Sequence, residues 1–424
     1  MRAPAGGIAH QTFRSLGVRN FRLFFIGQFV SQTGNWLTLV AQTLLVLKLT
    51  GSGVAVGVLT ACQFAPVLLL GPWAGLVADR SNKRRLLLAS NSVAMAQSVG
   101  LAALAFLDHP PVGWLYAIAV VGGLTTAFDN PARRSMVTEL VPRSDVPNAV
   151  SLNGAIMNGS SVVGPALAGL MITTVGYGWA FVVDAVSYIA VLAALWRIDS
   201  TGLRSGPLVE RRRGQVRAGL RYVRNDPVLW VSLVMMAIVG TLTFNFSVVF
   251  PLFVTRTLHG DDTAFTLLFS VTSVGSLAAA LAAAHRALVT LRSVVVACAG
   301  FGVSMVVLAA MPNLALAFPV GAAVGFGSIA FMTSSTTILH LRAEPAMRGR
   351  VLALQAMVFH GSTPIGGPTL GAICDAFGAR AGLVVGGTAA LGAAAWGATR
   401  LSRTHAGVDD TLDRLAREPA GEVP

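Results

Sequence analysis

Long apolar runs recur along the whole of this 424-residue chain. Hydrophobic residues make up 54% of the sequence and charged residues only 12%, about half the charge of a typical soluble domain. A helix needs about 20 residues to cross a hydrocarbon core of roughly 30 Å. Because lipid offers the backbone no hydrogen-bond partners, spans must be helices or a closed barrel, and continuous rather than alternating apolar runs indicate helices. The chain is therefore predicted to be an all-α integral membrane protein.

Twelve such runs are predicted to cross the membrane. They lie near residues 21–47, 53–78, 85–107, 112–128, 148–172, 176–196, 228–254, 263–285, 292–311, 314–337, 351–374 and 380–400. A polar stretch rich in arginine separates the sixth run from the seventh. The predicted parts are an N-terminal cytoplasmic segment 1–20, a first half 21–196, a linker 197–227, a second half 228–400 and a mobile cytoplasmic tail 401–424. The Arg211 to Arg224 part of the linker fits either a helix on the membrane face or a solvated tether.

Basic residues are distributed unevenly between the predicted loops. Of 31 Lys and Arg, only Lys48, Arg256 and Arg380 fall in loops on one side if the N-terminus is cytoplasmic. This asymmetry predicts that both termini are cytoplasmic. It also explains the net charge of +13 without nucleic acid as a partner.

The three cysteines, Cys62, Cys298 and Cys374, lie apart inside apolar runs and are predicted to be packing residues. No disulfide, metal site or cofactor is therefore expected. No phosphate-binding loop is present, which argues against ATP-driven transport.

A cluster of charge joins the second and third spans. It reads Gly71-Pro-Trp-Ala-Gly75-Leu-Val-Ala-Asp79-Arg80-Ser-Asn82-Lys83-Arg84-Arg85. A basic loop that orients two spans explains the last three residues, but it does not explain the spaced glycines and the acid. The stretch resembles the loop signature of the major facilitator superfamily. Asn82 stands where that pattern usually has glycine, and we expect it to adopt the same left-handed turn.

That resemblance implies two parallel six-helix halves related by a pseudo-twofold axis. Gly164-Pro165 in the fifth span matches Gly367-Pro368 in the eleventh, and small residues there are predicted to allow close helix packing. In the second half, Ala283 replaces the acid of the loop signature. Phe128-Asp129-Asn-Pro131-Ala-Arg133-Arg134 and Glu344-Pro-Ala-Met-Arg348-Gly349-Arg350 resemble the enterobactin-exporter and macrolide-efflux branch of the drug:proton antiporters. The span-four arginine of many proton-coupled members is missing.

Four amides lie on one face of the first span: Gln28, Gln32, Asn35 and Gln42. Amides facing lipid are costly, so this face is predicted to line a cavity, with hydrogen bonding between helices as the alternative. In the seventh span Asn245 and Phe246, at a predicted kink, are further candidates for contact with substrate.

Asp184 lies well within the sixth span, with Tyr188 one turn away. A carboxyl group in a membrane span is a candidate for proton coupling, and Tyr188 is a candidate for the cavity. A structural acid bonded to neighbouring helices, or one wetted at the outer interface, is the alternative. His360, in the eleventh span, is a second coupling candidate, with helix packing as its alternative.

These features predict a monomeric secondary transporter of the bacterial inner membrane that exports small amphipathic molecules, such as drugs, macrolides or siderophores, against inward proton flow. Asp79, Arg80, Lys83 and Arg84 are expected to meet Arg348 and Arg350 and close the inside, with Gly71 and Gly75 allowing the packing. One alternative is a proton- or ion-coupled symporter importing a small nutrient, which would be expected to carry more charged binding residues. The other is a sensor or scaffold without transport.

Overall fold

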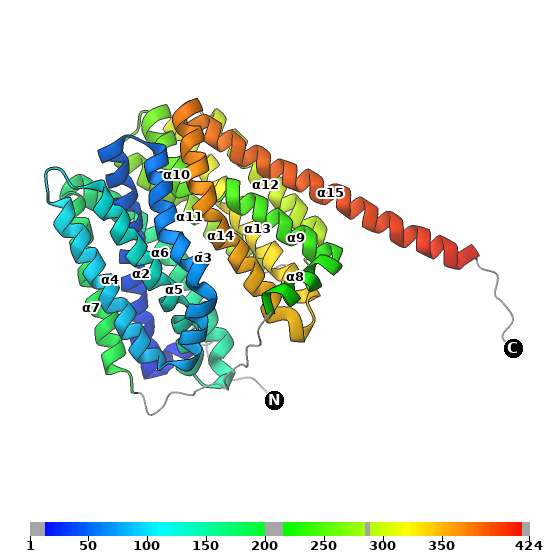
Figure 1. The fold of residues 1–424 in the computed structure, drawn as a ribbon, viewed down its shortest axis with the longest axis horizontal. Helices are drawn as coiled ribbons and strands as arrows, with labels where there is room; N and C mark the ends of the chain where they lie inside the picture. The colour runs from blue at the N-terminus through cyan, green and yellow to red at the C-terminus, as the bar shows by residue number, and fades with distance from the viewer. Residues whose placement is uncertain (1–12, 200–214, 285–288, 418–424) are drawn as a thin grey trace, which may run out of the picture.

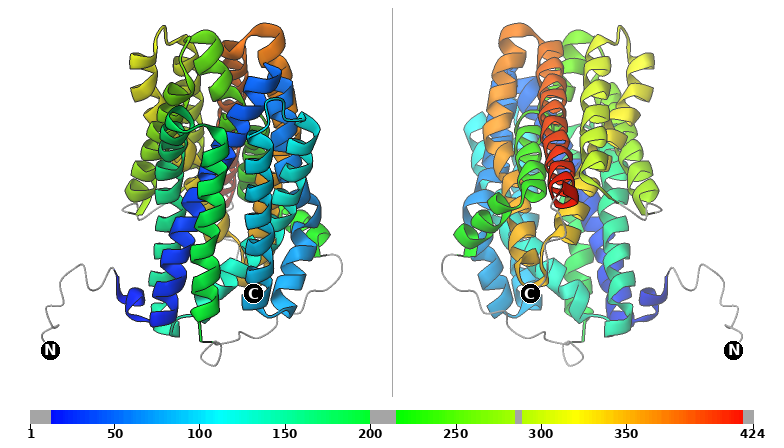
Figure 2. Two further views of the ribbon diagram at one scale, coloured as in Figure 1. Left: turned by 90° about the vertical axis from the view of Figure 1, so that its left-hand side faces the viewer. Right: turned by 90° about the vertical axis from the view of Figure 1, so that its right-hand side faces the viewer.

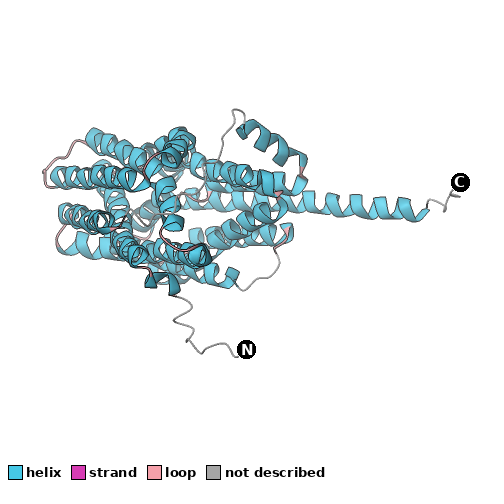
Figure 3. Cartoon of the chain, turned by 90° about the horizontal axis from the view of Figure 1, so that it is seen from below, coloured by secondary structure: helices cyan, strands magenta, loops and turns pink. Residues whose placement is uncertain are grey.

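The computed structural model describes residues 13–199, 215–284 and 289–417, and every regular element in these ranges is a helix (Figures 1 and 3). The long helices are α2 Arg19–Thr50, α3 Gly53–Arg80, α4 Lys83–Ala105, α5 Val112–Glu139, α6 Val146–Thr174, α7 Tyr177–Arg197, α9 Pro227–Leu242, α11 Asp262–Ala284, α12 Leu291–Ala310, α13 Leu314–Arg342, α14 Pro345–Phe377 and α15 Ala379–Arg417. Shorter elements are η1 Arg14–Gly17, η2 Arg143–Asp145, α8 Gln215–Asn225, α10 Phe246–Leu252 and η4 Phe253–Thr257.

The expected helical membrane fold is confirmed. Within the described ranges, 10 segments are long and apolar enough to cross a membrane. The helices α2 and α14 are also long, at 32 and 33 residues, but their glycines and polar side chains dilute their apolar character. The count of twelve spans stays a prediction, with α2 and α14 lying at the two positions that these 10 segments leave.

Two predicted span ends differ most from the structure. Helix α5 continues past residue 128 to Glu139, because Asp129 and Arg133 form an ion pair one turn apart (Nε to Oδ2, 3.5 Å). Helix α15 continues past residue 400 to Arg417, into the stretch predicted to be a mobile tail.

The two halves repeat one pattern of packing (Figures 1 and 2). In the first half α3 packs on α5, and α4 packs on α5 and α7. In the second half α11 packs on α13, and α12 packs on α13 and α15. Between the halves α3 packs on α14, and α6 packs on α11. Each of these pairs maps onto the other when the halves are exchanged, as the expected pseudo-twofold axis requires.

Glycines bring the halves into close contact. A Cβ on Gly57 of α3 would lie 2.5 Å from the carbonyl oxygen of Gly367 in α14. A Cβ on Gly169 of α6 would lie within 3.0 Å of Thr266 in α11. Figure 1 shows the halves together at the end where α3 begins and diverging towards the end where α14 begins. We call these the joined end and the splayed end.

The seventh span is broken, as predicted from its aromatic and proline residues. Helix α9 ends at Leu242, and α10 begins at Phe246. Gly366 of α14 packs against this break, since a Cβ there would lie 1.8 Å from the carbonyl oxygen of Thr241. The break is therefore held by a close backbone contact rather than left open.

The short helix α8 belongs to the predicted linker. Its Gly219 and Val223 are buried, and a Cβ on Gly219 would lie 3.2 Å from Leu354 of α14. The Tyr222 hydroxyl accepts a hydrogen bond from the Glu344 N–H (3.1 Å). The linker thus contains a helix that packs one face on α14, and its place relative to the membrane stays a prediction. Residues 200–214, which include Arg211, lie outside the described residues.

Candidate functional site

Asp184 is buried between three helices of the first half, with a relative exposure of 1%. Its Oδ2 accepts hydrogen bonds from Thr38 of α2 and Ser98 of α4, both at 2.6 Å. Its Oδ1 lies 3.4 Å from the hydroxyl of Ser187 on its own helix. A hydroxyl can donate to a carboxylate or accept from a carboxylic acid, so this shell accommodates both protonation states.

Gly34 makes this arrangement possible, because it lets α2 approach α7. A Cβ on Gly34 would lie 2.3 Å from Asp184 Oδ1 and 2.4 Å from the Ser187 hydroxyl. Two turns earlier in α2, a Cβ on Gly27 would lie 3.0 Å from the Cβ of Ala194 in α7. Small residues at this spacing allow two helices to pack at short distance.

We expect Gly34→Ala to lower the free energy of unfolding by about 1–3 kcal/mol, the usual cost of overpacking. Gly154→Ala in α6 is the matched control, since a Cβ there meets nothing within 4 Å. It should be neutral or stabilise by about 0.5–1 kcal/mol, because alanine favours the helix. Thermal unfolding of both variants in detergent measures the difference. Equal stability of the two would contradict the close contact.

A second polar cluster lies nearer the splayed end of the same half. Asp129 Oδ1 accepts hydrogen bonds from Ser90 (3.2 Å) and Asn91 (2.9 Å) of α4. Its other oxygen pairs with Arg133. Tyr188 is buried, at 6% exposure, on the helix that also carries Asp184. It therefore lies in the interior of the half rather than lining an open surface.

The amides of α2 are divided between two environments. Gln42 is buried, donates to the Leu115 carbonyl of α5 (3.0 Å) and accepts from Gln63 (3.2 Å). Gln28 is also buried, and its Nε2 has no hydrogen-bond partner in the described residues. Gln32 is half-buried and Asn35 is exposed. Two of the four amides thus remain accessible.

Asn245 lies at the break between α9 and α10 and is buried, at 3% exposure. Its Nδ2 donates to the Thr241 carbonyl (2.8 Å), while its Oδ1 has no partner in the described residues. Phe246 packs in an aromatic cluster with Phe244, Phe250 and Phe301, at centroid distances of 5.0–6.0 Å. The site predicted at this kink therefore consists of one amide with an unpaired oxygen beside an aromatic wall.

The loop signature makes contacts within the first half. Lys83 pairs with Glu139 at the end of α5 (3.2 Å), and Arg84 donates to the Leu195 and Trp196 carbonyls at the end of α7. The left-handed turn expected at Asn82 is wrong. Its φ and ψ are −66° and 109°, and its side chain caps α4 by accepting from the Arg85 N–H (3.1 Å).

The remaining members of the predicted gate are placed as follows. Gly75 is buried and Arg80 is exposed, while no atom lies within 4 Å of a Cβ built on Gly71. On α14, Arg350 donates to Met347 Sδ (3.2 Å), and Arg348 Nε is buried without a partner in the described residues. The side chains of Asp79 and His360 lie outside the described residues.

The predicted packing residues differ in what they join. Gly164 and Pro165 lie in α6 against α2, since a Cβ on Gly164 would lie 2.4 Å from Trp36 Cβ. Gly367 and Pro368 face α3 of the other half, with Pro368 Cα 2.6 Å from a Cβ built on Gly57. The first pair thus stabilises one half, whereas the second stabilises the contact between halves.

The sequence of the chain matches one known protein family over almost its whole length. The family described as transmembrane secretion effector matches residues 10–420. The chain is a member of the major facilitator superfamily. It is a transporter by family and fold, and not an enzyme.

Among the relatives of this transporter are proteins named as an efflux pump and as a siderophore transporter. The multidrug efflux pump Tap of Mycolicibacterium fortuitum is 27% identical over 85% of this chain and 90% of its own. The staphyloferrin A transporter of Staphylococcus aureus is 23% identical over 84% and 90%. A bacterial homologue of the human lysosomal transporter Spinster, solved in an inward-facing and occupied conformation, shares the fold with a TM-score of 0.71. It is 17% identical, and the match covers 92% of this chain and 97% of that chain.

The joined end of the transporter carries a cluster that sequence reasoning missed. Asp375, near the end of α14, accepts hydrogen bonds from the Gly53 N–H (2.8 Å), the Val54 N–H (2.9 Å) and the Ser52 hydroxyl (2.8 Å) at the start of α3. Arg256 donates to Asp375 Oδ1 (2.8 Å) and to the Gly51 carbonyl. We call these residues the joined-end clamp. Burial alone would raise the pKa of Asp375, but these hydrogen bonds lower it to about 2.

Two signals in the sequence pointed to this clamp. Ser52 precedes an apolar run, as helix-capping residues do, and Arg256 is one of few bases expected on that side. What the sequence did not show is that Asp375 of the other half meets them. Asp129 and Arg133 follow the apolar run predicted as the fourth span, and only the continuation of α5 to Glu139 brings them together as a pair.

Proposed function

We propose that this transporter exports small amphipathic molecules, such as drugs or siderophores, from the cytoplasm in exchange for protons. The observation that carries the proposal is the pair of contacts between halves, α3 with α14 and α6 with α11, which join at one end of the molecule and diverge towards the other. That is the geometry of one state in an alternating-access cycle. The family and the names of the relatives support export over import.

The distribution of bases supports an orientation for this state. Lys48, Arg256 and Arg380 lie at the joined end, whereas Lys83, Arg84, Arg348 and Arg350 lie at the splayed end. Cytoplasmic loops of membrane proteins carry the excess of Lys and Arg. We infer that the splayed end and both termini are cytoplasmic, so the state is inward-facing, in the bacterial inner membrane.

Gln32 and Asn35 are the proposed polar contacts for substrate. Helix α2 turns Gly27, Gly34 and Thr38 towards α7 and Thr33 towards α6. The amides lie on the remaining face, where Gln42 donates to α5 and Gln32, at the edge of the face, donates to Met157 Sδ of α6 (3.7 Å). Gln32 and Asn35 are the accessible members of that face, and Phe246 and Asn245 offer an aromatic wall with one unpaired oxygen on the other half. An amphipathic molecule matches this mixture of aromatic and amide groups.

Asp184 is the proposed proton carrier. It is enclosed by hydroxyls, it takes part in none of the ion pairs found in the described residues, and it lies on the helix that also carries Tyr188. Protonation there would change hydrogen bonds to α2 and α4 at once. Because α2 also carries the accessible amides, a proton on Asp184 and a substrate at Gln32 and Asn35 act on the same helix.

Export is tested by expression in a bacterium that lacks its own efflux pumps. We expect accumulation of at least one labelled amphipathic compound, drawn from a panel of drugs, macrolides and siderophores, to fall below that of the empty host. Dissipating the proton gradient should restore accumulation. A matched strain expressing Gln32→Leu with Asn35→Leu should lose export at normal protein level. Unchanged accumulation of the whole panel, or raised accumulation of a nutrient, would contradict the proposal.

A further inference from the structure

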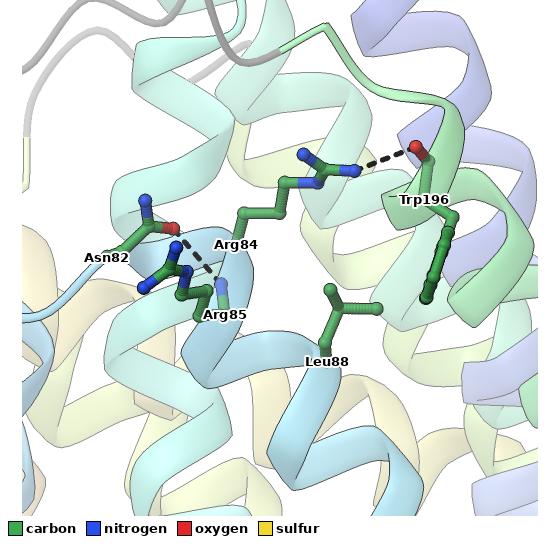
Figure 4. A pocket seen from close by; sticks show the side chains of 5 residues that line it. All are labelled: Asn82, Arg84, Arg85, Leu88 and Trp196. Atoms are coloured by element: carbon green, nitrogen blue, oxygen red, sulfur yellow. Dashed lines mark hydrogen bonds between the residues drawn. The ribbon is translucent and has the colours of Figure 1, made fainter.

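A pocket lies between the start of α4 and the end of α7, with a volume of about 250 Å³ (Figure 4). Its lining residues are Asn82, Arg84, Arg85, Leu88 and Trp196. It lies at the splayed end, on the outside of the first half, away from Asp184 and from the joined-end clamp. It combines two arginines with an apolar wall.

Arg84 is held in place by the end of α7. Its Nε donates to the Leu195 carbonyl (2.6 Å) and its Nη2 to the Trp196 carbonyl (2.7 Å), which caps carbonyls that a helix end leaves unpaired. Its remaining N–H groups are not used by these bonds. The guanidinium is thus a fixed donor beside the pocket rather than a mobile surface charge.

Arg85 adds a charge that pairs with no acid in the described part of the chain. Its side chain is exposed, and it forms none of the ion pairs found in the described residues. It stands in the first turn of α4, whose N-terminus contributes further positive potential. Positive charges at a helix N-terminus are unfavourable. An anion bound between Arg84 and Arg85 would therefore be stabilised by both arginines and by the helix.

The surfaces that lead away from the pocket are apolar and exposed. On α7, Val186, Ile189 and Trp196 share one face and are 57%, 55% and 74% exposed. On α4, Ala89 and Val93 continue the face of Arg85 and are also exposed. On helices that cross a membrane, such faces meet acyl chains, and tryptophan favours the level of the lipid head groups. The pocket therefore lies where a lipid-facing surface ends in positive charge.

We propose that this pocket binds an anionic phospholipid. Its phosphate lies between Arg84 and Arg85, the Asn82 amide donates to the head group, and the acyl chains run over Leu88 and Trp196 along α4 and α7. Free phosphate shares the head-group chemistry but makes no use of the apolar surfaces. The inner leaflet of a bacterial membrane supplies anionic lipid on the side where we place the splayed end.

The test is native mass spectrometry of the full chain, titrated with phosphatidylglycerol or phosphatidylcholine. Wild type should bind one phosphatidylglycerol more tightly than the next, and Arg85→Gln should weaken that event by about tenfold, the loss expected for a charge-assisted hydrogen bond. Arg217→Gln, which removes an exposed arginine from α8, is the matched control and should bind as wild type does. Equal losses in both variants, or none in Arg85→Gln, would overturn the proposal.

A second measurement separates lipid from phosphate. Brominated phosphatidylglycerol should quench tryptophan fluorescence more in wild type than in Trp196→Phe, and brominated phosphatidylcholine should show a smaller difference. Inorganic phosphate at millimolar concentration should not displace the bound lipid. Displacement by phosphate, or quenching by both lipids alike, would reject an anionic lipid site.

Discussion

Asp375→Ala is expected to shift the resting equilibrium of the transporter away from the inward-facing state by about five- to thirtyfold, or 1–2 kcal/mol. Asp375 receives bonds from three residues at the start of α3 and from Arg256. Removing the carboxylate leaves the first N–H groups of α3 without this partner, and Arg256 without its counter-charge. The side chain is 26% exposed, so solvent screening holds the effect below that of a buried ion pair.

Pulsed electron resonance between spin labels measures the shift. Labels at His109 and Phe377, both exposed at the joined end and on different halves, should show a longer distance in Asp375→Ala. Asp261→Ala is the matched control, because Asp261 caps α11 at the same end but stays within one half. An unchanged distance in Asp375→Ala, or an equal change in Asp261→Ala, would rule out the clamp.

The same measurement gives the pH dependence of the clamp. The pKa of Asp375 is lowered from 3.8 to about 2, so its stabilising effect is full above about pH 4 and is lost only as the pH falls towards 2. The difference in label distance between wild type and Asp375→Ala should therefore not change between about pH 5 and 8. A transition of that difference within this range would show that another titrating group controls the clamp.

A sequence-based proposal predicts the opposite shift. Asp79→Ala should favour the inward-facing state, because Asp79 is proposed to close the cytoplasmic end against Arg348 and Arg350. Ala283→Asp should not restore it. The Asp79 and Asp375 variants would then move the same two labels in opposite directions. If both variants change the label distance in the same direction, Asp79 and Asp375 do not close opposite ends of the transporter.

The fold was predictable because each span is decided by local composition. Continuous apolar runs locate the helices, and the positions of Lys48, Arg256 and Arg380 predict an orientation without any tertiary contact. The errors lie where a partner from another helix changes the local outcome. Asp129 ends an apolar run in sequence, yet Arg133, Ser90 and Asn91 stabilise its charge and let α5 continue to Glu139.

The candidate site was likewise predictable where local sequence decides it, and not where contacts between helices do. Asp184 stands out in sequence because it is an acid within a span, and its burial follows from that position. Its shell does not follow, since Thr38, Ser98 and Gly34 come from helices whose order in space one sequence does not give. Asp375 is the converse case. It stands at a span end, where an acid is ordinary, and only the contact of α14 with α3 gives it significance.

Asp184→Asn is expected to abolish proton-driven export while leaving the protein folded. Asparagine keeps the size of the side chain and retains hydrogen-bonding groups for Thr38 and Ser98, but it does not exchange a proton. The hydroxyls that surround the site do not ionise near neutral pH, so none of these hydrogen-bond partners replaces the lost carboxyl. Export driven by a proton gradient should therefore fall to the level of the empty host.

Reconstituted vesicles separate coupling from transport itself. Asp184→Asn should lose uphill transport driven by a proton gradient, yet retain exchange of labelled for unlabelled substrate, because exchange requires alternating access but no net proton movement. Ser187→Ala is the matched control, since its hydroxyl is the most distant donor, at 3.4 Å, and it should keep uphill transport. Uphill transport by Asp184→Asn at the wild-type rate would make Asp184 a structural acid. Loss of exchange together with uphill transport would place it in the conformational change rather than in proton coupling.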